Sequence, residues 1–170
     1  MGATFTVKLP LTIVDIRATP ATRTHPTAAS MNLPRAAIGL DGVRVLMVDD
    51  DPDALDLAST ILNGAGADVR KCLSAAEALE ILPQWPPDVL VSDIEMPDED
   101  GYSLIRKVRA WDAERGRRTP AVALTAYGRP QDRVRSLTAG YNMHVPKPVD
   151  PAELTTIIAS VVERPPQASP

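Results

Sequence analysis

The 170-residue sequence predicts a doubly wound α/β domain, in which helices cover both faces of a parallel sheet. Two observations carry this prediction. Short, nearly continuous apolar runs recur along residues 42–164, as expected of strands that are buried on both faces. Between these runs, apolar residues recur at helical spacing after recognisable helix starts. The composition agrees, because 44% of the residues are hydrophobic, enough for a packed core, and 24% are charged.

Five strands are expected. The strongest signals are the apolar runs at residues 43–48 ("VRVLMV"), 89–91 ("VLV") and 121–124 ("AVAL"). Residues 143–145 ("MHV") give a weaker signal, and residues 67–70 ("ADVR") the weakest, although both have the correct spacing. Five such segments alternating with helical segments in about 120 residues are typical of a doubly wound α/β fold.

Helices are predicted between these strands from apolar stripes and from helix starts. Ser74 and Glu77 have the spacing of a capping box, while Pro52 and Pro151 suit the first position of a helix. Three helices have apolar stripes, formed by Leu55, Ala58, Ile61 and Leu62, by Leu104, Ile105, Val108 and Trp111, and by Leu154, Ile157, Ile158 and Val161.

Polar side chains that could take part in chemistry follow several of the predicted strands. In an open parallel sheet, ligands bind beyond the carboxyl ends of the strands. Carboxylates crowded together there repel one another by about 4 kcal/mol per pair at 4 Å and an effective dielectric constant near 20. We therefore expect Mg²⁺, which prefers oxygen ligands, with a lysine as a second positive charge. The residues at these ends are Asp49, Asp50, Asp51, Asp93, Thr125 and Lys147.

This combination of groups suits phosphoryl chemistry. A carboxylate beside a divalent cation and a lysine can act as a nucleophile toward a phosphoryl group. The cation and the ammonium would stabilise the charge of the transferred oxygens, and the Thr125 hydroxyl would hydrogen-bond the product phosphate. The turn at Met96-Pro97 would free the backbone carbonyl of Glu95 to face the metal.

With these residues in place, residues 43–163 resemble the receiver domain of two-component response regulators, of the chemotaxis-regulator type. The resemblance implies a flavodoxin-like fold, with five helices around a parallel sheet of strand order 2-1-3-4-5. Its motif, DxxMPxxDG, is present as Asp93, Met96, Pro97, Asp100 and Gly101.

The resemblance also implies a metal and phosphorylation site. Asp93 matches the phosphorylated aspartate of the family, and Asp49 and Asp50 match its acidic pair. Asp50 would be a direct ligand of Mg²⁺, together with Asp93. Glu95 stands where the family donates a backbone carbonyl to the same ion.

A switch is implied near the same edge. Thr125 matches the switch hydroxyl of the family, and Lys147 matches its lysine, which precedes a proline that is usually cis. His144 is a departure, because many members carry Tyr or Phe at this position. Inward packing of His144, coupled to Thr125, would still allow a switch. Gating by the usual Tyr or Phe is in question, because His144 takes that position.

The chain divides into segments of different composition. Residues 1–12 include "GATFTVKLPL", which resembles the last strand of the ATP-binding domain of sensor histidine kinases. Residues 13–41 are rich in Thr, Ala and Pro and are predicted to form a linker. Residues 42–164 would be the receiver domain and residues 165–170 a tail. The chain is therefore interpreted as the C-terminal receiver of a hybrid histidine kinase.

The function implied is that of a phosphoacceptor in a phosphorelay, and not of an enzyme in itself. Asp93 would take a phosphoryl group from a phosphohistidine of a histidine kinase or phosphotransfer protein. The conformational change that follows phosphorylation would reach the face formed by the fourth helix, fifth strand and fifth helix. The resemblance also allows a homodimer through this face. A docking module that regulates its own kinase is one alternative. An aspartyl-phosphate phosphatase is another, because Glu95 is an acid two residues after the nucleophile.

Several other acidic residues have simpler interpretations. Asp51 is expected to cap a helix, and residues 98–100 to form an exposed turn and cap. A calcium loop beginning at "DDDPD" is excluded because Ala54 and Thr60 occupy the positions that require Gly and Glu. A receiver that keeps the fold but has lost the chemistry is disfavoured because the acidic, hydroxyl and lysine residues are all present.

Charge and composition exclude further classes. The net charge of −4 offers no footprint for nucleic acid, although residues 1–40 carry about +3 and residues 41–170 about −7. The single cysteine, Cys72, cannot form an internal disulfide and fits a reducing compartment. No stretch approaches the roughly 18 apolar residues of a membrane span, and no secretory signal is recognisable. We expect a cytoplasmic chain without membrane contact.

Overall fold

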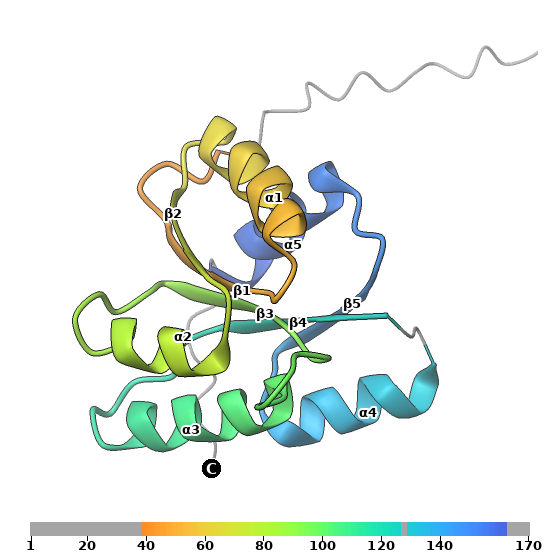
Figure 1. The fold of residues 1–170 in the computed structure, drawn as a ribbon. Helices are drawn as coiled ribbons and strands as arrows, with labels where there is room; N and C mark the ends of the chain where they lie inside the picture. The colour runs from red at the N-terminus through yellow and green to blue at the C-terminus, as the bar shows by residue number, and fades with distance from the viewer. Residues whose placement is uncertain (1–38, 127–128, 163–170) are drawn as a thin grey trace, which may run out of the picture. The chain divides into compact units, whose positions relative to one another are not determined.

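A parallel sheet lies between two layers of helices in the computed structural model, which describes residues 39–126 and 129–162 (Figure 1). The predictions for residues 1–12, for most of residues 13–41 and for residues 165–170 lie outside the described residues. In chain order the elements are β1 (Arg44–Val48), α1 (Pro52–Gly64), β2 (Asp68–Cys72), α2 (Ala75–Ile81), β3 (Val89–Asp93), α3 (Gly101–Ala113), β4 (Ala121–Thr125), α4 (Pro130–Ala139), β5 (Met143–Pro146) and α5 (Pro151–Val162).

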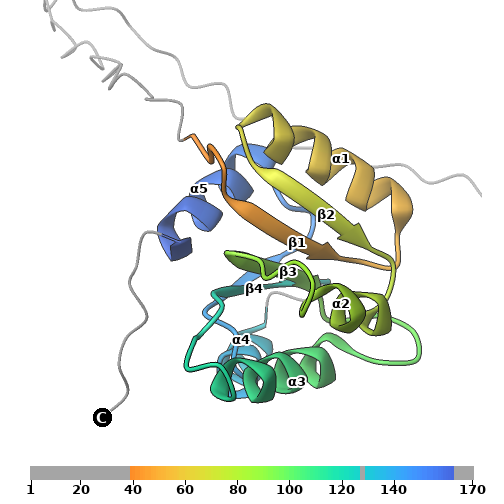
Figure 2. The ribbon, with the colours of Figure 1, turned by 90° about the vertical axis from the view of Figure 1, so that its left-hand side faces the viewer.

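The sheet has the order β2-β1-β3-β4-β5, and all four neighbouring pairs are parallel. Helices α1 and α5 cover one face, and α2, α3 and α4 cover the other (Figures 1 and 2). The order reverses between β1 and β3, because the chain runs outward from β1 to β2 and then returns to β3. The predicted fold class and strand order are therefore confirmed, and the reversal marks the edge where a ligand site is expected.

The apolar runs are explained by burial on both faces of the sheet. Along β1, Val45 and Met47 contribute to the core beneath α1 and α5, whereas Leu46 and Val48 contribute to the core beneath α2 and α3. Every residue of β3 and β4 is buried. Since a fully buried aliphatic side chain contributes about 1.5–3 kcal/mol, these three central strands supply much of the stability and hold their carboxyl ends firmly.

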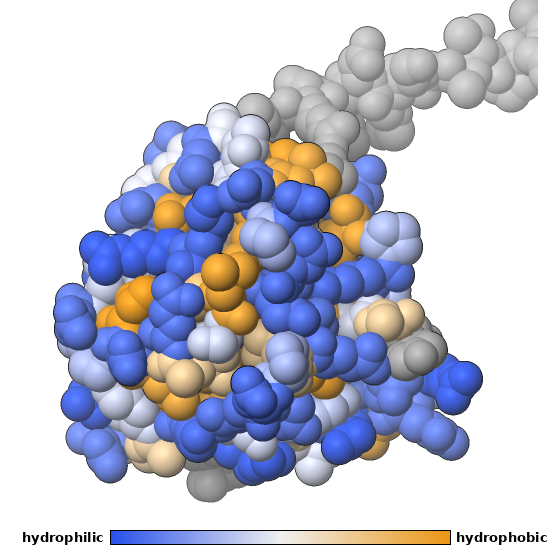
Figure 3. Space-filling view, viewed as in Figure 1, coloured by the Kyte–Doolittle hydropathy of each residue, from blue (hydrophilic) through white to orange (hydrophobic). Residues whose placement is uncertain are grey.

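The weaker sequence signals belong to elements at the margins of the fold. Edge strand β2 exposes three of its five residues, which explains why its apolar signal is weak, and it extends to Cys72 rather than ending at residue 70. No apolar stripe marks α4, where only Ser136 is buried and Val134 is 64% exposed. The molecular surface in the view of Figure 1 is mainly hydrophilic, with small separate hydrophobic patches (Figure 3).

Three acidic or hydroxyl side chains begin helices, as their positions predict. Asp51 accepts hydrogen bonds from two backbone amides of the first turn of α1, at 3.0 and 3.3 Å. Ser74 accepts one in α2 at 3.2 Å, and Asp100 accepts one in α3 at 2.7 Å. Each cap contributes about 1 kcal/mol. Among the described helices, none is long and apolar enough to span a membrane.

Candidate functional site

The carboxyl ends of β1, β3, β4 and β5 bring five polar residues to one edge of the sheet. Asp93 and Thr125 end β3 and β4, while Asp49 and Lys147 directly follow β1 and β5. Asp49, Asp93 and Thr125 are buried, with 3%, 6% and 4% of their surface exposed, and Asp50 is exposed. We call Asp49, Asp50, Asp93, Thr125 and Lys147 the strand-end cluster.

Lys147 connects the two buried carboxylates of the strand-end cluster. Its Nζ donates to Oδ2 of Asp49 at 2.6 Å and to Oδ2 of Asp93 at 2.7 Å. Burial of the ammonium lowers its pKa, but the hydrogen bonds and the negative charges of Asp49 and Asp93 together outweigh burial and raise the pKa of Lys147. The side chain is therefore a fixed positive charge at physiological pH.

Backbone amides hold the other oxygen of each buried carboxylate. Oδ1 of Asp49 accepts from the amide of Asp51 at 3.0 Å, and Oδ1 of Asp93 accepts from the amide of Glu95 at 3.1 Å. The chain turns immediately after both strands, which points these amides back toward the preceding side chains. Each carboxylate is thus oriented by a cation on one oxygen and an amide on the other, and a second lone pair on each oxygen can take a further ligand.

The acidic residues fit a small divalent cation. Asp49, Asp50 and Asp93 each offer a carboxylate oxygen, and these oxygens lie within 4.8 Å of one another. In the strand-end cluster, three carboxylates and one ammonium leave two negative charges uncompensated. An all-oxygen donor set with excess negative charge suits Mg²⁺, which binds one or two carboxylates and keeps several waters. The backbone carbonyl of Glu95 as a further ligand stays a prediction.

Thr125 is hydrogen-bonded to His144 of β5 and to Lys147, which follows β5. Its Oγ1 lies 3.0 Å from Nε2 of His144, and its backbone carbonyl accepts from the amide of Lys147 at 2.7 Å. The Lys147–Pro148 peptide is cis, as the resemblance predicts. The two predicted switch residues are therefore in contact, while their role as a switch stays a prediction.

Two further residues support the end of β3, and one of them carried no sequence signal. Tyr141, 3% exposed, donates from Oη to the carbonyl of Gly101 at 2.8 Å. A Cβ at Gly101 would collide with the backbone of Asp93 and Ile94, so glycine allows α3 to begin directly against the end of β3. Gly101 belongs to the motif read from the sequence, but nothing near Tyr141 in the chain indicates its contact 40 residues away.

An apolar cavity of about 510 Å³ opens beside the strand-end cluster. Ala54, Leu57 and Ile61 line it from α1, and Pro148 lines it from the segment after β5. Asp49 and Lys147 also line the cavity, and Leu57 is 64% exposed. A hydrophobic surface that includes an acid and an ammonium among its lining residues can receive part of another protein.

Comparisons with known proteins point to one family and one fold. The family model of the response regulator receiver domain matches residues 45–159. An uncharacterized 14.6 kDa protein of Leptolyngbya boryana is 46% identical over 114 residues, which cover 67% of this chain and 86% of that protein. Hybrid signal transduction histidine kinase D of Dictyostelium discoideum is 36% identical over 74% of this chain but only 8% of its own length.

A solved structure agrees as well. A putative response regulator from Chloroflexus aurantiacus is 32% identical, with a TM-score of 0.68, over 73% of this chain and all of that one. The chain spans about half the length of the transcriptional regulators that also match it, and less than a tenth of the hybrid kinase. The similarity is therefore to one domain of those longer proteins.

Proposed function

The chain belongs to the response regulator receiver domain family, the phosphoacceptors of two-component signalling, and from this premise we propose that Asp93 accepts the phosphoryl group. One observation carries the proposal: Lys147 Nζ lies 2.7 Å from Asp93 Oδ2, and carboxylate oxygens of Asp49, Asp50 and Asp93 lie within 4.8 Å of one another. The cluster combines a nucleophile with the positive charge that a transferred phosphoryl group needs.

The sheet register favours Asp93 over Asp49 as the acceptor. Asp93 pairs with Leu124 across β3 and β4, so the hydroxyl-bearing Thr125 follows directly on the neighbouring strand. Asp49 instead follows β1, whose neighbours are β2 and β3. A phosphoryl group on Asp93 would lie between Lys147 and Thr125, which can bind its oxygens from two sides.

The transfer proposed is a simple displacement at phosphorus. A carboxylate oxygen of Asp93 attacks the phosphorus of a phosphohistidine, and the bond between phosphorus and nitrogen breaks. The electron pair returns to the imidazole, which takes a proton from solvent. Lys147 then pairs with the phosphoryl oxygens and Thr125 donates its hydroxyl to one of them. Mg²⁺ held by Asp50, Asp93 and the Glu95 carbonyl would supply further positive charge to these oxygens.

The phosphoryl donor would be a histidine kinase or phosphotransfer protein, docked over α1 and the segment after β5. The apolar cavity beside the strand-end cluster supports this proposal, because it combines exposed Leu57 with Pro148 next to Lys147. An imidazole presented there would lie beside Lys147, which contacts Asp93. The chain would act as the acceptor in this exchange and not as an enzyme with a separate substrate. The Glu95 side chain is exposed, which gives no support to a phosphatase.

Labelling with a small phosphoryl donor tests the assignment. The chain is incubated with acetyl phosphate and Mg²⁺, and the phosphorylated fraction is measured by intact-protein mass spectrometry. We expect Asp93→Asn to lose the label, whereas Asp53→Asn, an exposed acid at the start of α1, should keep it. Label that persists in Asp93→Asn would show that another residue is the acceptor.

We also propose that the chain is the receiver of a hybrid histidine kinase. The similarity to a hybrid kinase of Dictyostelium discoideum supports this origin, as does the resemblance of residues 1–12 to the end of a kinase ATP-binding domain. Sequencing the coding region upstream tests it. A kinase core in the same reading frame is expected, and an unrelated or absent reading frame would contradict the proposal.

A further inference from the structure

The layer formed by α3 and α4 carries a charge opposite to that of the rest of the domain. Six basic residues against two acidic ones give residues 101–113 and 129–139 a net charge of +4. Residues 41–170 as a whole contain 21 acidic and 14 basic residues. The basic residues of this layer are Arg106, Lys107, Arg109, Arg129, Arg133 and Arg135.

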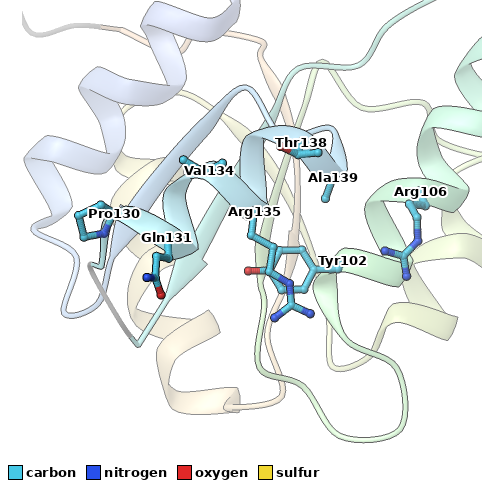
Figure 4. Close-up of a pocket in the computed structure, with 8 residues that line it drawn as sticks. All are labelled: Tyr102, Arg106, Pro130, Gln131, Val134, Arg135, Thr138 and Ala139. Carbon is cyan, nitrogen blue, oxygen red and sulfur yellow. The ribbon is translucent and has the colours of Figure 1, made fainter.

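A groove of about 690 Å³ lies between these two helices. Figure 4 shows Arg106 on α3 and Arg135 on α4, with the Tyr102 ring behind the guanidinium group of Arg135. Val134, which is 64% exposed, is one of the aliphatic residues along α4. We call this feature the α3–α4 groove and define it by Tyr102, Arg106, Pro130, Val134, Arg135 and Ala139.

The lining of the groove distinguishes between kinds of ligand. The guanidinium of Arg135 lies 4.1 Å from the centroid of the Tyr102 ring, and Tyr102 is only 6% exposed. The aromatic face is therefore already covered and offers no stacking surface to a planar ligand such as a nucleobase. What is left is aliphatic surface, at Val134 and Ala139, beside two guanidinium groups. That combination suits aliphatic side chains with carboxylates beside them.

We propose that the α3–α4 groove docks an acidic amphipathic helix of a partner protein. Its apolar side chains would lie against Val134 and Ala139, while its carboxylates would pair with Arg106 and Arg135, as in other complexes in which a helix lies in a groove. The partner's negative charge complements this basic layer and would be repelled by the acidic remainder of the domain. Docking at this surface goes beyond phosphoryl acceptance and does not depend on it.

The parts of this chain outside the structure do not have the required composition. Residues 1–38 carry four basic residues and one acidic residue, and residues 163–170 carry one of each. Neither segment can supply an acidic helix. Residues 1–38 and 163–170 therefore do not supply the complementary charge, and we assign it to a helix of a partner protein.

A synthetic peptide tests the proposal with the full chain. The probe is a fluorescent helical peptide of about 18 residues, long enough for a stable helix, with Leu along one face and Glu on either side of it. Binding is measured by fluorescence anisotropy at about 0.15 M salt, where exposed charges more than about 8 Å apart are largely screened. We expect the wild-type chain to bind the peptide. A peptide of the same composition with scrambled order should bind at least about tenfold more weakly, a difference of about 1.4 kcal/mol.

Matched substitutions locate the binding surface. Arg106→Glu and Val134→Asp should each weaken binding by about tenfold or more, because one reverses a lining charge and the other places a carboxylate on the aliphatic surface. Arg133→Glu makes the same charge change on α4 outside the groove and should change affinity by less than about twofold. Circular dichroism establishes that each variant is folded, which surface positions such as 106, 133 and 134 allow.

Each of four results would overturn the proposal. The first is an absence of wild-type binding at a peptide concentration of about 1 mM, which corresponds to an affinity weaker than about −4 kcal/mol. The second is equal binding of the scrambled peptide, which would show a general attraction for anions. The third is an equal loss in Arg133→Glu and Arg106→Glu. The fourth is wild-type self-association in sedimentation that Arg106→Glu abolishes, which would make a second copy the occupant.

Discussion

Two buried groups of charges lie at opposite edges of the sheet, and they differ in how fully their charges are paired. Near the start of β4, the carboxylate of Asp112, 2% exposed, accepts from Arg109 at 2.8 Å and from the amide and hydroxyl of Thr119 at 2.8 and 2.7 Å. Arg109 also donates to the carbonyls of Thr119 and Gly140. The negative charge of this carboxylate is thus matched by the guanidinium of Arg109. We call Arg109, Asp112 and Thr119 the paired cluster.

The strand-end cluster has the opposite balance, with three carboxylates and one contacting ammonium. A buried carboxylate that is fully paired holds two segments together and has little capacity for another ligand. Carboxylates that share one cation repel one another and retain lone pairs for a metal or a phosphoryl group. Burial of charge alone therefore does not identify a site, whereas an excess of buried charge of one sign does.

The largest effect is expected in the paired cluster. Asp112→Ala removes one partner of a buried ion pair and leaves Arg109 without its carboxylate, so the free energy of unfolding should fall by about 3–5 kcal/mol. Urea denaturation measures this change. Glu114→Ala, at an exposed position just after α3, should change stability by no more than about 0.5 kcal/mol. A loss below about 1 kcal/mol in Asp112→Ala would contradict a structural role for this pairing.

A smaller effect is expected at Gly101, which adjoins the strand-end cluster through the backbone of Asp93. Gly101→Ala forces a Cβ against that backbone, so we expect a loss of about 1–3 kcal/mol and slower phosphorylation of Asp93. Denaturation and the acetyl phosphate assay measure the two changes. Gly64→Ala is the matched control, because its added Cβ would meet nothing within 4 Å beyond its chain neighbours and the backbone of its own helix, and it should be neutral or stabilising. Equal effects of both substitutions would show that the close approach at Gly101 is unimportant.

The strand-end cluster itself should respond in the opposite direction to the paired cluster. Asp50→Asn removes an exposed negative charge that repels Asp49 and Asp93, so in EDTA the Tm should rise slightly, on the order of 1–3 °C. Addition of Mg²⁺ should raise the Tm of the wild-type chain, since a ligand that binds the folded state stabilises it, and should raise that of the variant much less. Thermal unfolding with and without Mg²⁺ measures both. If Mg²⁺ raises the Tm of Asp50→Asn as much as that of the wild-type chain, Asp50 is not part of the metal site.

The smallest effect on stability is expected at the ion pair of Asp88 and Arg44, which is only partly buried. Asp88 accepts from the backbone and side chain of Arg44 at 2.9–3.3 Å, and both side chains are more than a third exposed. Burial raises the pKa of Asp88, but these hydrogen bonds and the positive charges of Arg44 and Arg117 together lower it below the ordinary value of 3.8. The pair therefore stabilises the fold above that pH, and its contribution is lost as the pH falls through the lower pKa of the folded state.

Because solvent screens this pair, Asp88→Asn should cost less than about 1 kcal/mol at pH 7. The difference from the wild-type chain should shrink as the pH is lowered below about 4. Urea denaturation at several pH values measures it. A difference that instead grows on acidification would show that the pKa of Asp88 is raised in the folded state.

Much of the fold and of the candidate site could be predicted because both depend on local patterns. Apolar runs that end in Asp49, Asp93 or Thr125 identify buried strands together with the residues at their carboxyl ends. Parallel pairing then requires those ends to meet at one edge, whatever the details of packing. The prediction that Lys147 lies at the same edge required only a fifth parallel strand in register with the others.

The remaining features depend on tertiary contacts that leave no local pattern. Arg109 resembles an exposed basic residue of an amphipathic helix, and only the packing of α3 against the start of β4 gives it Asp112, Thr119 and Gly140 as partners. The same applies to Tyr141, whose hydroxyl reaches a carbonyl 40 residues away.

The strand-end cluster carries excess negative charge, and we infer that it binds a cation and accepts a phosphoryl group on Asp93. One experiment tests this inference. It is a crystal structure of the chain with Mg²⁺ and beryllofluoride, an analogue of the phosphoryl group. We predict beryllium bonded to a carboxylate oxygen of Asp93, Lys147 in contact with fluoride, and Mg²⁺ beside Asp50. Beryllofluoride bound to another residue, or an Asp93 carboxylate still free while Mg²⁺ is bound, would contradict the account.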